Sequence, residues 1–175
     1  ENEQLKQELN LSEKYGQYTT VPGTIISRDI SNYTKTIVIN VGKDDGIEEK
    51  MTVIANEGLV GYVVSVTSHT AKIQTIADSA SATSCLTSTT RETMISKGTV
   101  EKNSLLKATY IETSANIIEG DSLETSGLGG IYIKGIYVGK VKKVVDGTNK
   151  IDSYAVIESA VDFEKLETVL VITNQ

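Results

Sequence analysis

The stretch GDSLETSGLGGIYIKGIYVGKVKKV, residues 120–144, decides what this chain can fold into. It contains six of the fourteen glycines, and most other positions are β-branched, aromatic or lysine. Gly127, Gly129 and Gly130 have backbone freedom that residues with a Cβ lack, so the sequence predicts a sharp turn there. β-Branched and aromatic residues favour strands. The stretch therefore predicts a strand, a tight loop and a second, bent strand.

Part of this stretch has a counterpart earlier in the chain. Residues 60–66 and 138–144 share the pattern V-G-x-V-x-x-V, and each copy is followed by A-x-I, at 71–73 and 155–157. Self-similarity of this kind indicates repeated structural units. We therefore expect two related β-modules.

Length and composition fit two small modules. The chain has 175 residues, 39% of them hydrophobic and 23% charged, which is ordinary for a folded protein. Tryptophan is absent and phenylalanine occurs once, so the core must come mainly from valine and isoleucine. The composition predicts small barrels or sandwiches with aliphatic cores.

The charge argues against nucleic acid as a partner. The net charge is −6, and no run of basic residues is longer than Lys142-Lys143, whereas phosphate binding needs a clustered positive surface. Cys85 is the only cysteine, so it is expected to be a small buried hydrophobic residue. No stretch reaches the roughly twenty apolar residues of a membrane span. Because the sequence begins without methionine, we expect it to be a fragment from which a membrane anchor can have been cut away.

The first segment, residues 1–16, is the only one that predicts a helix. ENEQLKQELNLSEKY contains strong helix formers and places Leu5 and Leu9 one turn apart. Leu5 would be a d position and Leu9 an a position, so the segment is interpreted as the end of a self-associating coiled coil. The alternative is a capping helix that lays Leu5, Leu9 and Leu11 on the first barrel.

Residues 17–80 are predicted to form the first barrel. Pro22 would open an edge strand, and Asp45-Gly46 is a hairpin signal that favours a turn with positive φ. Short strand patterns bounded by turn residues follow one another, as in small barrels. The predicted strands are 24–29, 36–41, 51–55, 58–66 and 70–76.

Residues 81–160 are predicted to form the second barrel. The Ser/Thr/Ala-rich segment 77–90 is either a linker or a strand pair, and we favour strand. The apolar run 169–172, within the tail 161–175, must be buried and can close either barrel. The other predicted strands are 93–100, 105–111, 121–125, 131–144 and 154–158.

Six short segments of the sequence together form a family pattern: ENEQL at 1–5, NVGKDDGI at 40–47, GLVG at 58–61, TSGLGG at 125–130, KGI at 134–136 and VGKV at 138–141. They resemble the rod shape-determining protein MreC family over nearly the whole chain. The chain departs from the usual pattern at Lys50, where the family commonly has glycine, and at Ile133, where it commonly has proline.

The resemblance implies an all-β fold of two six-stranded barrels, of chymotrypsin-like barrel architecture, behind an N-terminal coiled coil. It also implies a non-enzymatic scaffold, without cofactors, in the machinery of lateral cell-wall synthesis. The expected partners are a further copy of the chain, a class B penicillin-binding protein, MreB, MreD and RodA. The expected location is the cell membrane, with a single-pass anchor outside this sequence and the present part outside the cytoplasm.

The same architecture raises a rival hypothesis, a chymotrypsin-like hydrolase that uses His69, Asp78 and Ser122. The order of these residues fits a catalytic triad, which needs a base, a carboxylate and a nucleophile within hydrogen-bond reach. Asp78 follows His69 by nine positions, which is a very short spacing for that fold, and Leu123-Glu124 follows Ser122 where oxyanion-hole glycines are expected. The hypothesis depends on whether the three side chains converge in space.

The sequence predicts no metal site, because the single histidine has no second imidazole or thiolate near it. The glycine-rich loop is interpreted as a tight barrel turn, with contact to a partner protein as the alternative. This candidate contact loop consists of Thr125, Ser126, Gly127, Leu128, Gly129 and Gly130.

Overall fold

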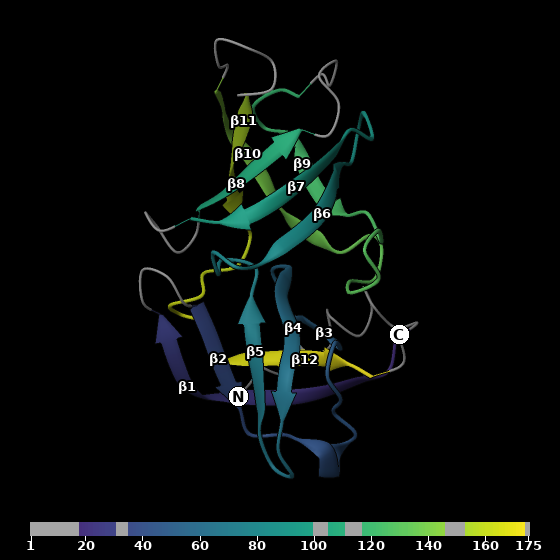
Figure 1. Cartoon of the computed structure of the whole chain (residues 1–175), viewed down its shortest axis with the longest axis vertical. Helices are drawn as coiled ribbons and strands as arrows, with labels where there is room; N and C mark the ends of the chain where they lie inside the picture. Colours follow the sequence, from purple (N-terminus) through teal and green to yellow (C-terminus); the bar gives the residue numbers. More distant parts are fainter. Residues whose placement is uncertain (1–17, 31–34, 100–104, 111–116, 146–152, 174–175) are drawn as a thin grey trace.

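The computed structural model describes residues 18–30, 35–99, 105–110, 117–145 and 153–173. Within these ranges the chain forms twelve strands and one short 3-10 helix. The strands make two closed antiparallel barrels that are stacked along the long axis of the molecule (Figure 1). The all-β, two-barrel prediction is confirmed. The predicted helix over 1–16, with Leu5 and Leu9, lies outside the described residues.

The first barrel combines five strands from the first half of the chain with the last strand. Its order around the barrel is β1-β12-β3-β4-β5-β2. β12 therefore returns to the first barrel, where Val171 lies opposite Val21 of β1 and Leu170 opposite Ile54 of β3. The strands are β1 Thr20–Ile30, β2 Lys35–Ile39, β3 Thr52–Ile54, β4 Leu59–Val66, β5 Ala71–Thr75 and β12 Thr168–Ile172.

The second barrel is built from consecutive strands in the order β10-β11-β8-β7-β6-β9. The Ser/Thr/Ala-rich segment contributes β6, which pairs with β7, so the strand interpretation of that segment is confirmed. Its small side chains alternate between buried and less buried positions. The strands are β6 Ala82–Thr87, β7 Thr93–Gly98, β8 Leu105–Tyr110, β9 Ser122–Thr125, β10 Tyr137–Val145 and β11 Tyr154–Ser159.

Pro22 does not open an edge strand of a sheet, because β1 belongs to a closed barrel. The residues before Ile25 pair only with β12, and those from Ile25 onward pair with β2. Thr173 N donates to Thr19 O, and Ile25 N donates to Glu167 O. In an antiparallel pair such bonds fall on every second residue, so residues 19, 21, 23 and 25 of the chain face β12 with their N–H and C=O groups. Pro22 therefore lies at a position whose nitrogen faces away from β12, so its missing N–H removes no bond from that ladder.

The predicted hairpin at Asp45-Gly46 is wrong, although the predicted backbone conformation is present. Gly46 has a φ of 86° and ends the 3-10 helix η1, Lys43–Asp45. The strands on either side, β2 and β3, are not neighbours in the barrel. Local turn chemistry specified the bend, whereas the strand partners were decided by burial of both strands in a closed barrel.

The predicted strand 131–144 begins later than expected, at Tyr137. Gly135 adopts a φ of 89°, and its N–H donates to Thr125 O, which closes a loop instead of extending β10. The apolar residues Ile131 and Tyr132 pack against the core from this loop rather than from a strand. A hydrophobic, β-branched run is compatible with either arrangement.

The repeat in the sequence corresponds to equivalent strands. β4 and β10 carry the two copies, and each has a bulge in its pairing, between Val63 and Ser65 and between Val141 and Lys143. A Cβ on Gly61 or Gly139 would lie about 2 Å from a carbonyl oxygen of the neighbouring strand, at 2.0 and 2.1 Å. Close approach of two neighbouring backbones therefore explains both glycines.

The equivalence extends around both barrels. Starting at these strands, the ring β4-β5-β2-β1-β12-β3 corresponds to β10-β11-β8-β7-β6-β9. Each barrel therefore has the same succession of strands, but the last strand of the chain takes the place in the first barrel that β6 takes in the second. The first barrel is a circular permutation of the second.

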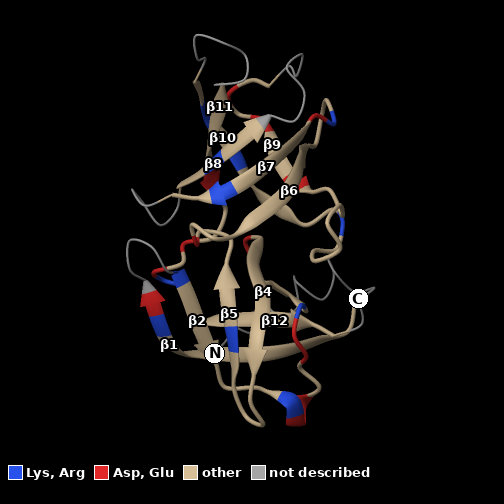
Figure 2. Cartoon of the chain, in the orientation of Figure 1, with Lys and Arg blue, Asp and Glu red and all other residues tan. Residues whose placement is uncertain are grey.

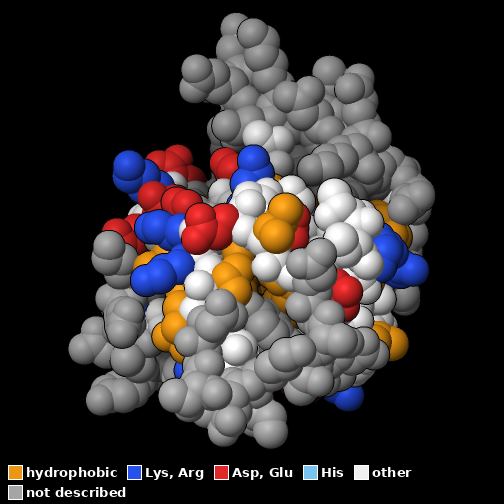
Figure 3. Space-filling view, turned by 90° about the horizontal axis from the view of Figure 1, so that it is seen from above, with side chains coloured by type: hydrophobic (Ala, Val, Ile, Leu, Met, Phe, Trp, Pro, Cys, Tyr) orange, Lys and Arg blue, Asp and Glu red, His pale blue; other side chains and the backbone are white. Residues whose placement is uncertain are grey.

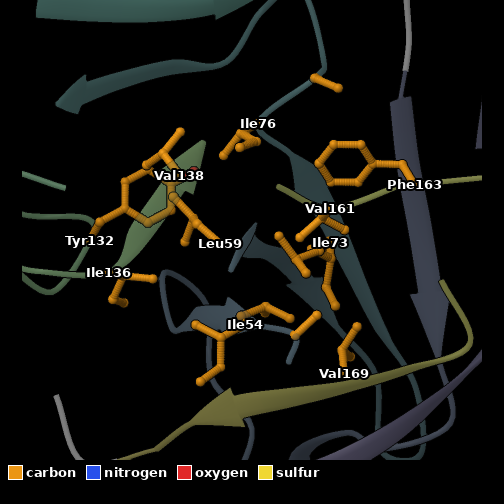
Figure 4. Packing of buried hydrophobic residues seen from close by; sticks show 14 of the residues in the cluster. Ile54, Leu59, Ile73, Ile76, Tyr132, Ile136, Val138, Val161, Phe163 and Val169 are labelled. Carbon is orange, nitrogen blue, oxygen red and sulfur yellow. The ribbon is translucent and has the colours of Figure 1, made fainter. Parts of the chain in front are cut away.

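One cluster of buried residues runs through both barrels and their junction. Figure 4 shows Leu59 and Ile76 of the first barrel facing Tyr132 and Val138 of the second. Most members are isoleucine, valine and leucine, as the composition predicted, and full burial of each contributes roughly 1.5–3 kcal/mol. Phe163, the only phenylalanine, is 2% exposed. The barrels share their core and pack as one body.

Lys50 gives a test of the repeat, because it matches Gly120 of the second barrel. The N–H of each donates to the equivalent valine of β4 or β10, and their φ values are 71° and 91°. A residue with a Cβ in this conformation costs about 1–2 kcal/mol. We predict that Lys50→Gly is about 1 kcal/mol more stable than Lys50→Ala in urea unfolding, because only glycine relieves the strain.

The matched control is Lys72, an exposed residue within strand β5. There the order must reverse, with Lys72→Ala more stable than Lys72→Gly, because glycine in a strand loses backbone entropy without relieving strain. If alanine were also the more stable residue at position 50, the strain attributed to Lys50 would be absent.

A candidate partner-contact loop at the barrel junction

Residues 126–136 form a loop between β9 and β10, and Thr125, the last residue of β9, closes its base. The Thr125 hydroxyl donates to Ile133 O and accepts from Ile136 N at 2.9 Å. Thr125 N also donates to Ile136 O. These bonds satisfy the backbone at both ends of the loop.

A second contact fixes the loop to β6. The Ser126 hydroxyl bonds the hydroxyl of Ser84 at 2.7 Å, and Leu128 N donates to the Ser126 hydroxyl at 3.2 Å. Gly127 adopts a φ of 81°, and a Cβ there would meet the Lys134 side chain at 3.0 Å. The first half of the loop is therefore held by side-chain hydrogen bonds and by a tight approach of its two arms.

The tip of the loop projects away from the protein. Gly129 and Gly130 have φ values of 91° and 74°, and a Cβ on either would meet no atom within 4 Å. Both φ values are consistent with the sequence prediction that these glycines are needed for the backbone conformation of the turn. Between Gly127 and Gly129, Leu128 is 64% exposed. The loop thus presents an apolar side chain on a braced base.

The second half of the loop reaches the junction between the barrels. The ring of Tyr132 meets Tyr62 of β4 edge to face, with centroids 5.9 Å apart and an interplanar angle of 83°. Burial raises the pKa of Tyr132, opposed by the neighbouring hydroxyls of Ser81 and Thr83. Aromatic pairs of this geometry contribute about 0.5–1.5 kcal/mol beyond their buried area. The loop is therefore anchored to both barrels.

Close backbone contacts hold the barrels against each other. A Cβ on Gly58 would lie 2.6 Å from Tyr137 O, and a Cβ on Gly98 would lie 1.9 Å from Ala77 O. Ala160 N donates to Val138 O, where the chain leaves the second barrel. Such contacts leave no room for larger residues and fix the position of the loop relative to the first barrel.

Asp78 organises the connection from β5 to β6. Its carboxylate accepts hydrogen bonds from Lys35 N at 2.9 Å and from Ala80 N at 2.8 Å. The Lys35 side chain is buried, which lowers its pKa, while the Asp78 charge opposes that shift. Its ammonium donates to Thr99 O of the second barrel. Asp78 is thus a structural residue at the junction.

The proposed triad does not form. His69 lies in the β4–β5 turn, exposed, and pairs with Asp44 at 3.3 Å rather than with Asp78. Ser122 begins β9 of the second barrel, while the β4–β5 turn lies at the far end of the first (Figure 1). The hydrolase hypothesis therefore loses the convergence that it requires.

Sequence reasoning missed the roles of Lys35 and Tyr132. A lysine before a β-branched run predicts an exposed strand end, but Lys35 is buried and its ammonium donates to Thr99 O, next to β7. Cys85 is fully buried, as predicted, and burial raises the pKa of its thiol to about 12. Within the described ranges, no group of three or more His, Cys, Asp or Glu residues is placed to hold a metal ion.

The end of the molecule that the second barrel forms carries both charged and hydrophobic side chains on its surface. Seen from above, acidic and basic side chains gather on the left, and hydrophobic side chains reach the surface near the centre (Figure 3).

Comparison with known proteins identifies the fold. The family model described as rod shape-determining protein MreC, barrel core, matches residues 25–173. The chain belongs to the MreC family. The resemblance read from the sequence motifs is therefore confirmed.

Relatives called cell shape-determining protein MreC match over most of this chain. The Streptococcus pneumoniae protein is 24% identical over 178 residues, covering 99% of this chain and 65% of the relative. The Bacillus subtilis protein is 26% identical, covering 99% and 63%. The Escherichia coli protein is 31% identical over 137 residues, covering 77% and 36%. The chain thus spans less than two thirds of the length of these MreC proteins.

Solved MreC structures share the two-barrel arrangement. One MreC structure superposes with a TM-score of 0.87 at 25% identity, covering 98% of both chains. MreC from Pseudomonas aeruginosa superposes with a TM-score of 0.82 at 26% identity, covering 88% of this chain and 99% of that one.

Within the described part of the present chain, no helix is long and apolar enough to cross a membrane.

Thr125 tests how the loop is held. We predict that Thr125→Val, which keeps the shape but removes the hydroxyl, destabilises the fold by about 1–3 kcal/mol, since Ile133 O and Ile136 N lose a partner. Hydrogen exchange at the Ile136 amide should accelerate more than exchange in β4. Thr109→Val, in an exposed position of β8, is the control and should leave both measurements unchanged. Unaltered exchange at Ile136 in Thr125→Val would contradict this account of the loop base.

Proposed function

We propose that this chain is the extracytoplasmic part of a non-enzymatic scaffold that organises the lateral peptidoglycan-synthesis machinery through protein–protein contacts. The observation that carries the proposal is the loop 125–130, which presents exposed Leu128 from a base fixed to both barrels. Catalysis needs converging polar groups, whereas an apolar side chain on a braced loop suits recognition of another protein.

The proposed main partner is a class B penicillin-binding protein. One structural neighbour is a complex between penicillin-binding protein PBP2 and MreC from Helicobacter pylori, whose MreC superposes on this chain with a TM-score of 0.69 at 23% identity. That complex supports the same kind of partner for a chain with the same fold. MreB, MreD and RodA are proposed as further members of the assembly by family resemblance.

The proposed location follows the same comparison. Another neighbour, with a TM-score of 0.76 and 22% identity, is described as the major periplasmic domain of the cell shape-determining filament MreC. We place the two barrels outside the cytoplasm, held at the membrane by a single-pass anchor that precedes the present sequence.

The contact is expected to depend on shape and apolar burial. Leu128 is one of three large hydrophobic residues with high exposure among the described residues, together with Ile26 and Ile118. Burying such a side chain in a partner's pocket contributes affinity that salt does not screen. The net charge of −6 would act mainly on the rate of encounter.

Leu128→Asp tests the contact. We predict a loss of affinity of about tenfold or more for the extracytoplasmic part of a class B penicillin-binding protein, because the variant buries a charge in place of an apolar side chain. Surface-immobilised binding at low and high ionic strength provides the measurement. The wild-type dissociation rate should change little with salt.

Ile26→Asp and Ile118→Asp are matched controls, since both residues are exposed to a similar extent, 57% and 61%, on other parts of the molecule. They should bind as the wild type does. Unchanged affinity of Leu128→Asp with an intact fold would exclude the loop as the contact, and a strong loss of wild-type affinity with salt would contradict an apolar contact.

Self-association is proposed to depend on the N-terminal segment. Leu5→Asp/Leu9→Asp should abolish the weak dimer expected of the chain in sedimentation experiments, because two heptads are marginal and cannot tolerate charges at a and d. Leu11 occupies a c position in that register, so Leu11→Asp should self-associate like the wild type. Unchanged association of the double variant would move the interface onto the barrels.

A further inference from the structure

Three lysines lie in one row on the outer face of the second barrel. Lys97 of β7 lies directly opposite Lys107 of β8. Lys107 lies opposite Val156 of β11, and Val156 lies opposite Lys143 of β10. All three lysines are exposed, and Figure 2 shows basic segments on the strands of this barrel. Like charges directly opposite each other destabilise a strand pair, so a bound anion would relieve the repulsion between Lys97 and Lys107.

A cavity lies at this pair of lysines. Its volume is about 510 Å³, within the range of small-molecule sites. Its walls come from the outer faces of β7, β8 and β11 and from the adjoining chain. The strand residues of the cavity whose side chains enter the argument are Ile95, Lys97, Lys107, Thr109, Tyr154 and Val156.

Tyr154 positions one of the two charges. The Lys107 ammonium lies over the tyrosine ring, 4.3 Å from the ring centroid. Such a cation–π contact holds the ammonium without neutralising it, so Lys107 keeps its capacity to bind an anion. The neighbouring wall is apolar, formed by Ile95 and Val156, with the Thr109 hydroxyl beside them.

Acidic neighbours do not neutralise the pair. Glu158, the acidic residue on the outer face of β11, lies opposite Lys140 of β10 and Leu105 of β8. Across the described ranges, no carboxylate forms an ion pair with Lys97 or Lys107. In a chain with a net charge of −6, two unneutralised lysines that share one cavity form a local positive field.

We propose that this cavity binds a sugar that carries a phosphate or carboxylate group. The anionic group lies between the ammonium groups of Lys97 and Lys107, and relieves their repulsion. The sugar ring rests on Ile95 and Val156 with its hydroxyls within reach of Thr109. A sugar matches this wall because it offers C–H faces together with hydroxyl groups, whereas a bare ion would leave the apolar wall uncovered.

The test is a titration of the chain followed by amide chemical shifts in NMR. Glucose 1-phosphate and glucuronate are the probes, and glucose and inorganic phosphate are the comparisons. Saturable shifts in β7, β8 and β11 with both anionic sugars, weaker shifts with inorganic phosphate and none with glucose would support the proposal. Equal affinity for inorganic phosphate would overturn the assignment of a sugar.

Lys97→Met/Lys107→Met should weaken binding of glucose 1-phosphate at least about tenfold, because two charge-assisted contacts are lost. Lys72→Met/Lys165→Met removes the same charge from exposed positions of the first barrel and its adjoining chain, and should bind as the wild type does. Without a ligand, Lys97→Met should raise the midpoint of urea unfolding. Absence of saturable shifts in the wild type, or equal shifts in both double variants, would overturn the site.

Discussion

Insertion of β12 between β1 and β3 is the interaction on which the rest of the structure depends. Without this strand the first barrel would expose two unpaired edges and the cluster around Val169 and Val171. The segment before this strand carries the chain back across the junction after the second barrel is complete, through Ala160 and Phe163. Closure of the first barrel and attachment of the second therefore depend on the same C-terminal segment.

The shared core turns two small barrels into one support for the loop. The Gly58 contact with Tyr137 and the edge-to-face pair of Tyr62 and Tyr132 leave little freedom at the junction. Because Thr125 closes the base of the same loop, the direction of Leu128 is set by both barrels together. A contact surface prepared in this way loses less entropy on binding than a free loop would.

The two proposed binding surfaces of the second barrel depend on different interactions. The loop offers an apolar side chain that salt does not screen, whereas the cavity at Lys97 and Lys107 attracts anions through a local positive field. They also lie on different strands, the loop between β9 and β10 and the cavity on β7, β8 and β11. Ligands at both surfaces are therefore compatible in principle.

The sequence by itself determined the β class, the aliphatic core, the repeat and the positive φ at Gly46, because alternation, composition and glycine act over a few residues. Only the tertiary structure decided which barrel β12 closes and that β2 and β3 do not pair, because a strand pattern does not name its neighbour. It also separated His69 from Asp78 and buried Lys35, since a side chain's surroundings come from segments far apart in the sequence.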